Sequence, residues 1–202
     1  ERFVFRSGFV MRQIFAAAKK APKRVIYADG EDERVMRAAE VLIEEGIARP
    51  ILIGRPAVIE TRLKRYGLSI KPGTDFEIVN PEDDPRFRQY WETYHRLMGR
   101  EGVNPEAAKA AVRRSTTLIS ALMVHLGDAD AMVCGVNGRF DGHLDHVRDV
   151  IGLRAGSSGF STMNALMLEK HTLFIADTYV NEDPSAEQLA ERSEEHTSEL
   201  QS

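Results

Sequence analysis

Residues 24–54 read RVIYADGEDERVMRAAEVLIEEGIARPILIG, the sequence of one strand–helix–strand unit. Short runs rich in Val and Ile predict strands at Arg24–Ala28 and Pro50–Ile53. Between the two strands, apolar residues recur at the spacing of one helix face, at Val35, Ala38, Ala39, Leu42 and Ile43. Gly46 follows this helix, where a left-handed residue commonly ends the last turn. Two strands joined by a helix indicate an α/β fold with a largely parallel sheet.

The same alternation continues toward the middle of the chain. Further strands are predicted at Phe76–Val79 and Ala131–Cys134, each bounded by charge, Gly or Pro. Helical spacing also connects a set of large apolar side chains, Phe87, Tyr90, Trp91, Tyr94 and Met98. A surface that stacks nucleic-acid bases would also use aromatic side chains, but it requires basic surroundings. We therefore interpret this aromatic stripe as part of the core.

The charge balance excludes several classes of partner. The chain has 202 residues, is 43% hydrophobic, and carries 27 Lys and Arg against 31 Asp and Glu. Its net charge of -4 provides no basic field for nucleic acid or for an anionic membrane. The single cysteine, Cys134, cannot form an internal disulfide, and no apolar run approaches the roughly 20 residues of a membrane helix. We expect a soluble, cytoplasmic protein.

The character of the sequence changes after Gly152. A Gly/Ser loop at 156–159 leads to a strand-like run at Thr172–Ala176. Ser185 and Gln188 have the spacing of a capping box at the start of a helix. These features predict a first α/β lobe over 9–152 and the start of a second lobe over 153–191.

Both ends of the chain carry separate expectations. The final residues, 192–202, read RSEEHTSELQS, which matches the translation of a sequencing adapter, and we expect this tail to be foreign. The sequence lacks an initiator Met, so we expect the natural N-terminus to lie upstream. Residues 1–8 are interpreted as the end of a linker from an absent upstream domain.

A glycine-containing loop follows the predicted strand at 131–134. Its sequence CGVNGRFDG places Gly135, Gly138 and Gly142 at spacings that match neither a dinucleotide-binding fingerprint nor a P-loop. Ligands in open α/β sheets gather at the carboxyl ends of strands, so this loop is either a ligand contact or a simple turn. The loop at Asp29 is a weaker phosphate candidate, because the carboxylates at 31–33 would repel an anion.

Five potential metal ligands lie close together, at Asp141, His143, Asp145, His146 and Asp149. His143 and His146 are three residues apart and would share one helix face. Charged residues that open a helix are usually solvated, and the sequence offers no second cluster of ligands, so we predict no metal here. Cys134, at the end of an apolar strand, is interpreted as a buried, inert thiol rather than a nucleophile.

Several strings carry a family resemblance. They are RVIYADGEDERVMR (24–37), EGIARPILIGRPAV (45–58), DFEIVNPEDDPRFRQYWETYH (75–95), GDADAMVCG (127–135) and IADTYVNEDPSAEQLA (175–190). Together they resemble the phosphate acetyl/butyryltransferase family over residues 6–191, and NPEDDPRFRQYWETYH and CGVNGRF resemble the branch fused behind bacterial malic enzymes. The resemblance implies a two-lobed, three-layer α/β/α architecture in which acyl-CoA and phosphate meet between the lobes. The family's catalytic serine, arginine and aspartate would lie beyond Glu191, so we expect no catalytic residue in this chain.

Departures from the family pattern bear on activity. Met98 stands where acetyltransferases carry an arginine, and Asp145 aligns with a second arginine of the family. Neither side chain can make the bidentate hydrogen bonds that a guanidinium makes to phosphate. Arg34 matches a family arginine and either contacts a phosphate group or covers the helix surface. The resemblance implies contacts with acyl-CoA or phosphate at Arg34, Gly135, Asn137, Gly138 and Arg139.

The leading functional hypothesis is a regulatory and oligomerising domain that senses acetyl-CoA. An absent upstream domain would be an NADP-dependent malic enzyme, which oxidatively decarboxylates malate to pyruvate with NADP and Mg²⁺ or Mn²⁺. We expect no cofactor in this chain itself, and a homo-oligomer formed through this domain. The alternative is a genuine phosphate acetyl/butyryltransferase that moves an acyl group between CoA and phosphate. A third reading is an assembly domain without a ligand.

Overall fold

The computed structural model describes residues 2–168, 172–176, 180–181 and 183–191. These residues form two compact units. The larger unit is Arg12–Gly152, and the smaller combines the described residues up to Met11 with those from Leu153 onward. Helix α1 (Arg2–Lys20) begins within the stretch that the sequence analysis interpreted as linker, and it runs without a break through the predicted boundary at residue 9.

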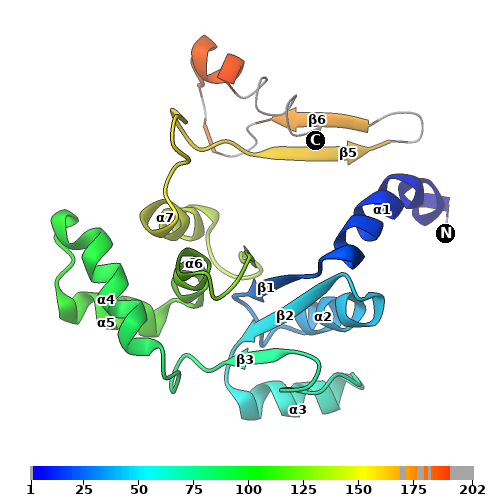
Figure 1. The fold of residues 1–202 in the computed structure, drawn as a ribbon, viewed down its shortest axis with the longest axis horizontal. Coiled ribbons are helices and arrows are strands. Elements are labelled where there is room, and N and C mark those ends of the chain that lie inside the picture. The colour runs from blue at the N-terminus through cyan, green and yellow to red at the C-terminus, as the bar shows by residue number, and fades with distance from the viewer. Residues whose placement is uncertain (1, 169–171, 177–179, 182, 192–202) are drawn as a thin grey trace. The chain divides into compact units, whose positions relative to one another are not determined.

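The larger unit is built on a parallel sheet, shown with its helices in Figure 1. Its strands are β1 (Lys23–Tyr27), β2 (Ala48–Ile53), β3 (Glu77–Val79) and β4 (Ala131–Val133). The helices after α1 are α2 (Glu33–Glu45), α3 (Pro56–Tyr66), α4 (Phe87–Met98), α5 (Pro105–Arg114), α6 (Thr116–Leu126) and α7 (Phe140–Val150), with a 3₁₀ turn at Gly99–Glu101. The strand order is β3-β2-β1-β4, and every neighbouring pair is parallel.

Each face of this sheet is covered by its own helices. Along β2, Ile51 and Ile53 join one buried cluster, while Leu52 between them joins the other. This alternation follows from the period of two in a strand. The Ile51 side packs against α4, α5, α6 and α7, and the Leu52 side packs against α2 and α3, which confirms a three-layer α/β/α fold (Figure 1).

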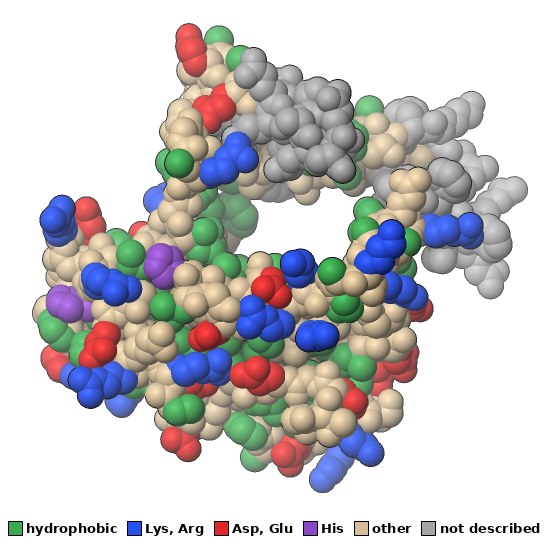
Figure 2. All heavy atoms as spheres, viewed as in Figure 1, with side chains coloured by type: hydrophobic (Ala, Val, Ile, Leu, Met, Phe, Trp, Pro, Cys, Tyr) green, Lys and Arg blue, Asp and Glu red, His purple; other side chains and the backbone are tan. Residues whose placement is uncertain are grey.

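The predicted strands and helices of this unit are present with small shifts at their ends. Gly46 adopts φ 65° and ends α2, and its N–H donates to the carbonyl of Ile43 at 3.0 Å. The aromatic stripe belongs to the core as predicted, because Tyr90 and Tyr94 are buried and Trp91 packs against the same cluster. Figure 2 shows that acidic and basic side chains are interspersed over the visible face of this unit.

The smaller unit contains a strand pair. Strand β5 (Met163–Met167) runs antiparallel to β6 (Thr172–Ala176), and only β6 was predicted from the sequence. A short helical segment covers 186–191. Its predicted capping box is confirmed: the Ser185 N–H donates to Gln188 Oε1 at 2.9 Å, and the Gln188 N–H donates to Ser185 Oγ at 3.3 Å.

Two further expectations concern the C-terminal tail and membrane-spanning helices. The tail at 192–202, expected to be foreign, lies outside the described residues. In the part of the chain that is described, no helix has both the length and the apolar character needed to cross a membrane.

Candidate functional site

The strand order places a crevice at one edge of the sheet. The chain passes from β1 to β2 and β3 on one side, and β4 then pairs on the other side of β1. Such a reversal leaves an opening outside the carboxyl ends of the two strands on either side of it, where α/β proteins commonly bind ligands. In this protein the opening lies between the loops that follow β1 and β4.

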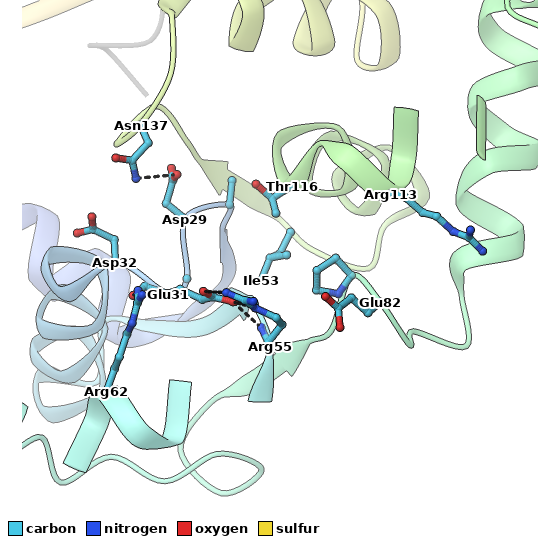
Figure 3. Close-up of a pocket in the computed structure, with 14 residues that line it drawn as sticks. Asp29, Glu31, Asp32, Ile53, Arg55, Arg62, Glu82, Arg113, Thr116 and Asn137 are labelled. Atoms are coloured by element: carbon cyan, nitrogen blue, oxygen red, sulfur yellow. Dashed lines mark hydrogen bonds and ion pairs between the residues drawn. The ribbon is translucent and has the colours of Figure 1, made fainter. Parts of the chain in front are cut away.

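Asp29 joins these two loops. Its Oδ2 accepts a hydrogen bond from the Val136 N–H at 3.2 Å, and its Oδ1 accepts one from Asn137 Nδ2 at 3.4 Å (Figure 3). Val136 also packs against the apolar cluster on the α2 side of the sheet. The loop after β4 is therefore held both by a carboxylate and by an apolar anchor.

A pocket of about 410 Å³ opens at this edge of the sheet (Figure 3). Its walls come from the loops after β1, β2 and β3, from α3, from the junction of α5 and α6, and from the loop after β4. Polar side chains on these walls include Asp29, Glu31, Asp32, Arg55, Arg62, Glu82, Arg113, Thr116 and Asn137. The pocket thus mixes carboxylates and guanidinium groups rather than presenting one sign of charge.

Most guanidinium groups of this pocket already have partners. Arg55 donates from Nε and Nη2 to the two carboxylate oxygens of Glu31, both at 2.9 Å. These hydrogen bonds from Arg55 lower the pKa of Glu31. Arg62 donates to the backbone carbonyl of Glu31. The guanidinium carbon of Arg113 lies 4.9 Å from the centre of the Phe87 ring, and Figure 3 shows this side chain directed away from Asp29 and Asn137.

Asp32 closes the N-terminus of α2. Its Oδ1 accepts the N–H of Arg34 at 2.9 Å, and its two oxygens also accept from the Arg34 guanidinium, both at 3.0 Å. The hydrogen bond from the Arg34 side chain is the main reason that the pKa of Asp32 falls to about 2. A carboxylate of the chain therefore occupies the end of this helix where an anion would otherwise bind.

The five residues predicted as ligand contacts are only partly brought together. Asn137 lines the pocket, and Gly135, Gly138 and Arg139 belong to the same loop. Arg139 pairs with Asp141 at 2.6 Å. Arg34 starts α2, is not among the pocket's lining residues, and has a side chain that is 71% exposed while paired with Asp32.

The glycine loop wraps around His143. Gly135 and Gly138 have φ values of 93° and 102°, which glycine adopts without a steric penalty. His143 Nδ1 lies 2.8 Å from Thr117 Oγ1, and its Nε2 lies 2.7 Å from the carbonyl oxygen of Asn137. Both ring nitrogens of this candidate metal ligand are thus engaged with protein groups.

The other candidate residues lie in environments that suit a structural role. Among the residues that the structure describes, no group of three His, Cys, Asp or Glu side chains converges as a metal site would require. Cys134 is half-buried, and burial raises the pKa of its thiol, which disfavours the reactive thiolate. Met98 packs against the core cluster, and Asp145 pairs with Arg148 at 2.8 Å.

The sequence analysis ranked the loop at Asp29 low and did not single out Arg55 or Thr117. Asp29 had a readable signal, because it follows a predicted strand directly and so lies at the ligand-binding edge of the sheet. Arg55 has the same kind of signal, because it follows closely after the end of β2, directly after Gly54. No local sequence pattern marked Thr117, because its contact with His143 joins residues 26 positions apart.

Comparisons with known proteins agree with this architecture. A family model described as "Phosphate acetyl/butaryl transferase" matches residues 9–201. An NAD-dependent malic enzyme of Rhizobium meliloti is 59% identical over 191 residues, and an NADP-dependent malic enzyme of Escherichia coli is 50% identical over 189. Each alignment covers 94% of this chain, which spans 25% of the length of each of these relatives.

A solved structure carries the same fold. The phosphotransacetylase of Streptococcus pyogenes matches with a TM-score of 0.78 and 26% sequence identity, over 89% of this chain and 55% of that one. The shared three-layer fold, the sequence similarity and the family model that matches most of the residues point the same way. The chain belongs to the phosphate acetyl/butaryl transferase family.

Proposed function

We propose that this chain is an effector-binding and assembly domain of a malic enzyme, and that it senses acetyl-CoA. Sequence identity supports the malic-enzyme assignment, since it is 59% and 50% to two proteins named malic enzymes and 26% to the phosphotransacetylase. In the parent protein, a separate region would decarboxylate malate oxidatively to pyruvate. This domain would bind the effector and form the homo-oligomer, in the cytoplasm and without nucleic acid or membrane.

The neutralised arginines are the observation that carries the regulatory role. Acyl-phosphate chemistry needs guanidinium groups that are free to clamp phosphate oxygens. Arg34, Arg55 and Arg139 pair instead with carboxylates of the same chain, at 3.0, 2.9 and 2.6 Å. Of the three, Arg55 lines the pocket, and a phosphate bound to its guanidinium would have to displace Glu31. Binding a ligand through its neutral and hydrogen-bonding parts requires breaking none of these ion pairs.

The pocket offers suitable groups for such binding. The Asn137 amide and the Thr116 hydroxyl both line it, and each can donate and accept hydrogen bonds. The pantetheine arm of CoA carries amide and hydroxyl groups of matching chemistry. The coenzyme and metal of the parent would belong to its malic-enzyme region, with Mg²⁺ or Mn²⁺ and either NADP or NAD, since the names of the two relatives differ on this point.

A genuine phosphate acetyl/butyryltransferase is the second candidate. The phosphotransacetylase fold and the placement of the pocket at the switch point of the sheet favour it. The two candidates differ in what acetyl-CoA does to the protein. An effector changes the rate of another reaction, whereas a substrate is consumed in the presence of phosphate.

The test uses the whole parent protein and two variants. We expect acetyl-CoA to change the rate of malate-dependent coenzyme reduction in a saturable way, and Asn137→Ala to require a higher acetyl-CoA concentration for the same change. Gln89→Ala is the matched control, since Gln89 is exposed on α4 and does not line this pocket. An unchanged rate at saturating acetyl-CoA, or equal responses of the two variants, would contradict the proposal.

A further inference from the structure

His143 lies between α6 and the loop after β4. Its Nε2 is 2.7 Å from the carbonyl oxygen of Asn137, and its Nδ1 is 2.8 Å from Thr117 Oγ1. A carbonyl oxygen only accepts hydrogen bonds, so Nε2 must carry a hydrogen and donate it. The Thr117 hydroxyl can donate to Nδ1, which completes both hydrogen bonds with a neutral ring. Thr117 is buried in the first turn of α6, so the imidazole is held from the interior side.

The loop is shaped to fit this imidazole. A Cβ added at Gly138 would lie 2.8 Å from His143 Nε2, closer than real Cβ contacts allow. Gly138 is therefore required both by its φ of 102° and by the approach of the ring. From the other side, Asp29 accepts hydrogen bonds from the Val136 N–H and from the Asn137 side chain. Asn137 is thus held at its carbonyl by His143 and at its amide by Asp29.

We propose that His143 is the positioning residue of this loop, which it fixes through the Asn137 carbonyl so that the Asn137 side chain faces the pocket. The ring does not line the pocket itself and would act on a ligand only through Asn137. That acetyl-CoA is the ligand rests on the proposed function. The fixing of the loop by His143, here called the clamp, rests on the contacts of His143 alone.

Two substitutions at His143 separate its two hydrogen bonds. The amide of a glutamine reaches the position of Nε2, and the amide of an asparagine reaches the position of Nδ1. His143→Gln can therefore keep the bond to the Asn137 carbonyl, and His143→Asn can keep only the bond to Thr117. The matched control is His125→Gln, because His125 is exposed on α6, away from this loop.

Hydrogen–deuterium exchange of the peptide covering 134–140, measured on the full chain, reads the clamp without any ligand. In His143→Asn we expect the amide hydrogens of this peptide to exchange about five- to tenfold faster than in the unsubstituted chain, the factor that one net hydrogen bond gives. In His143→Gln we expect their exchange rate to stay within about twofold of that in the unsubstituted chain. Peptides from β2 and α2 report unfolding of the whole unit. If the Asn variant unfolds, the Gln variant decides alone: protected exchange supports the clamp, and lost protection overturns it.

Acetyl-CoA affinity of the same variants gives the second readout. We expect the Asn variant to bind more weakly and the Gln and His125→Gln variants to bind as the unsubstituted protein does. Equal effects of the Asn and Gln variants on exchange, or no effect of either, would overturn the inference. Absence of acetyl-CoA binding in the unsubstituted protein would overturn the proposed function instead, and the exchange rates would still decide the role of His143.

Discussion

Substitution of Asp32 tests how the start of α2 is stabilised. Loss of a helix-capping side chain costs about 0.5–2 kcal/mol. The ion pair with Arg34 adds at most about 1 kcal/mol, because the Arg34 side chain is 71% exposed and solvent screens the pair. We therefore expect Asp32→Ala to lower the free energy of unfolding by about 0.5–3 kcal/mol. Asp32→Asn retains a cap acceptor and should cost less than about 1 kcal/mol.

Urea unfolding of both variants at neutral pH measures these differences. Equal losses in Asp32→Ala and Asp32→Asn would refute the capping argument and would assign the stabilisation to charge alone. The pH dependence supplies a second check with a defined sign. The pKa of Asp32 in the folded protein is lowered to about 2, below its ordinary value of about 3.9. The contribution of the Asp32 charge to the free energy of unfolding is thus complete above about pH 4. The greater stability of the unsubstituted protein relative to Asp32→Asn should vanish as the pH falls toward about 2.

Other substitutions test the core and the glycine loop. Leu118 is 0% exposed in the core, so Leu118→Ala should cost about 2–5 kcal/mol in urea unfolding, against less than about 0.5 kcal/mol for the exposed control Val41→Ala. Similar losses in the two would contradict the assignment of the core. Gly138→Ala should cost more than about 1 kcal/mol because of its positive φ and its approach to His143. Gly142→Ala, in α7 with no atom within 4 Å of an added Cβ, should be neutral or stabilising, and the reverse order would refute the role of the loop.

The sheet could be predicted because its signals are local. The apolar runs at Arg24–Ala28 and Pro50–Ile53 coincide with β1 and β2 to within two residues at each end. Strand β2 begins earlier than predicted, at Ala48, because Ala48 and Arg49 pair with Lys23 and Arg24 of β1. Such pairing depends on the neighbouring strand and leaves no pattern in the residues themselves.

The candidate site was less accessible from the sequence, for a physical reason. Asn137 was named through the family resemblance, and its loop follows a predicted parallel strand, at the edge of the sheet where ligands gather. Its contact with Asp29 joins residues 108 positions apart, and no periodicity encodes such a distance. Arg34 is different, since its partner Asp32 is only two residues away. A carboxylate at the start of a helix beside an arginine could have been interpreted as a cap with its own counter-ion.

Acetyl transfer by the whole parent protein is the measurement that tests the central claim most directly. The protein is supplied with acetyl phosphate and CoA, and formation of the acetyl-CoA thioester is followed alongside malate-dependent coenzyme reduction in the same preparation. The account predicts malate oxidation with acetyl transfer at background, because the family resemblance implies arginines in the transferases where this chain has Met98 and Asp145, and because Arg34, Arg55 and Arg139 are paired with carboxylates. Turnover that depends on acetyl phosphate and clearly exceeds background would contradict it.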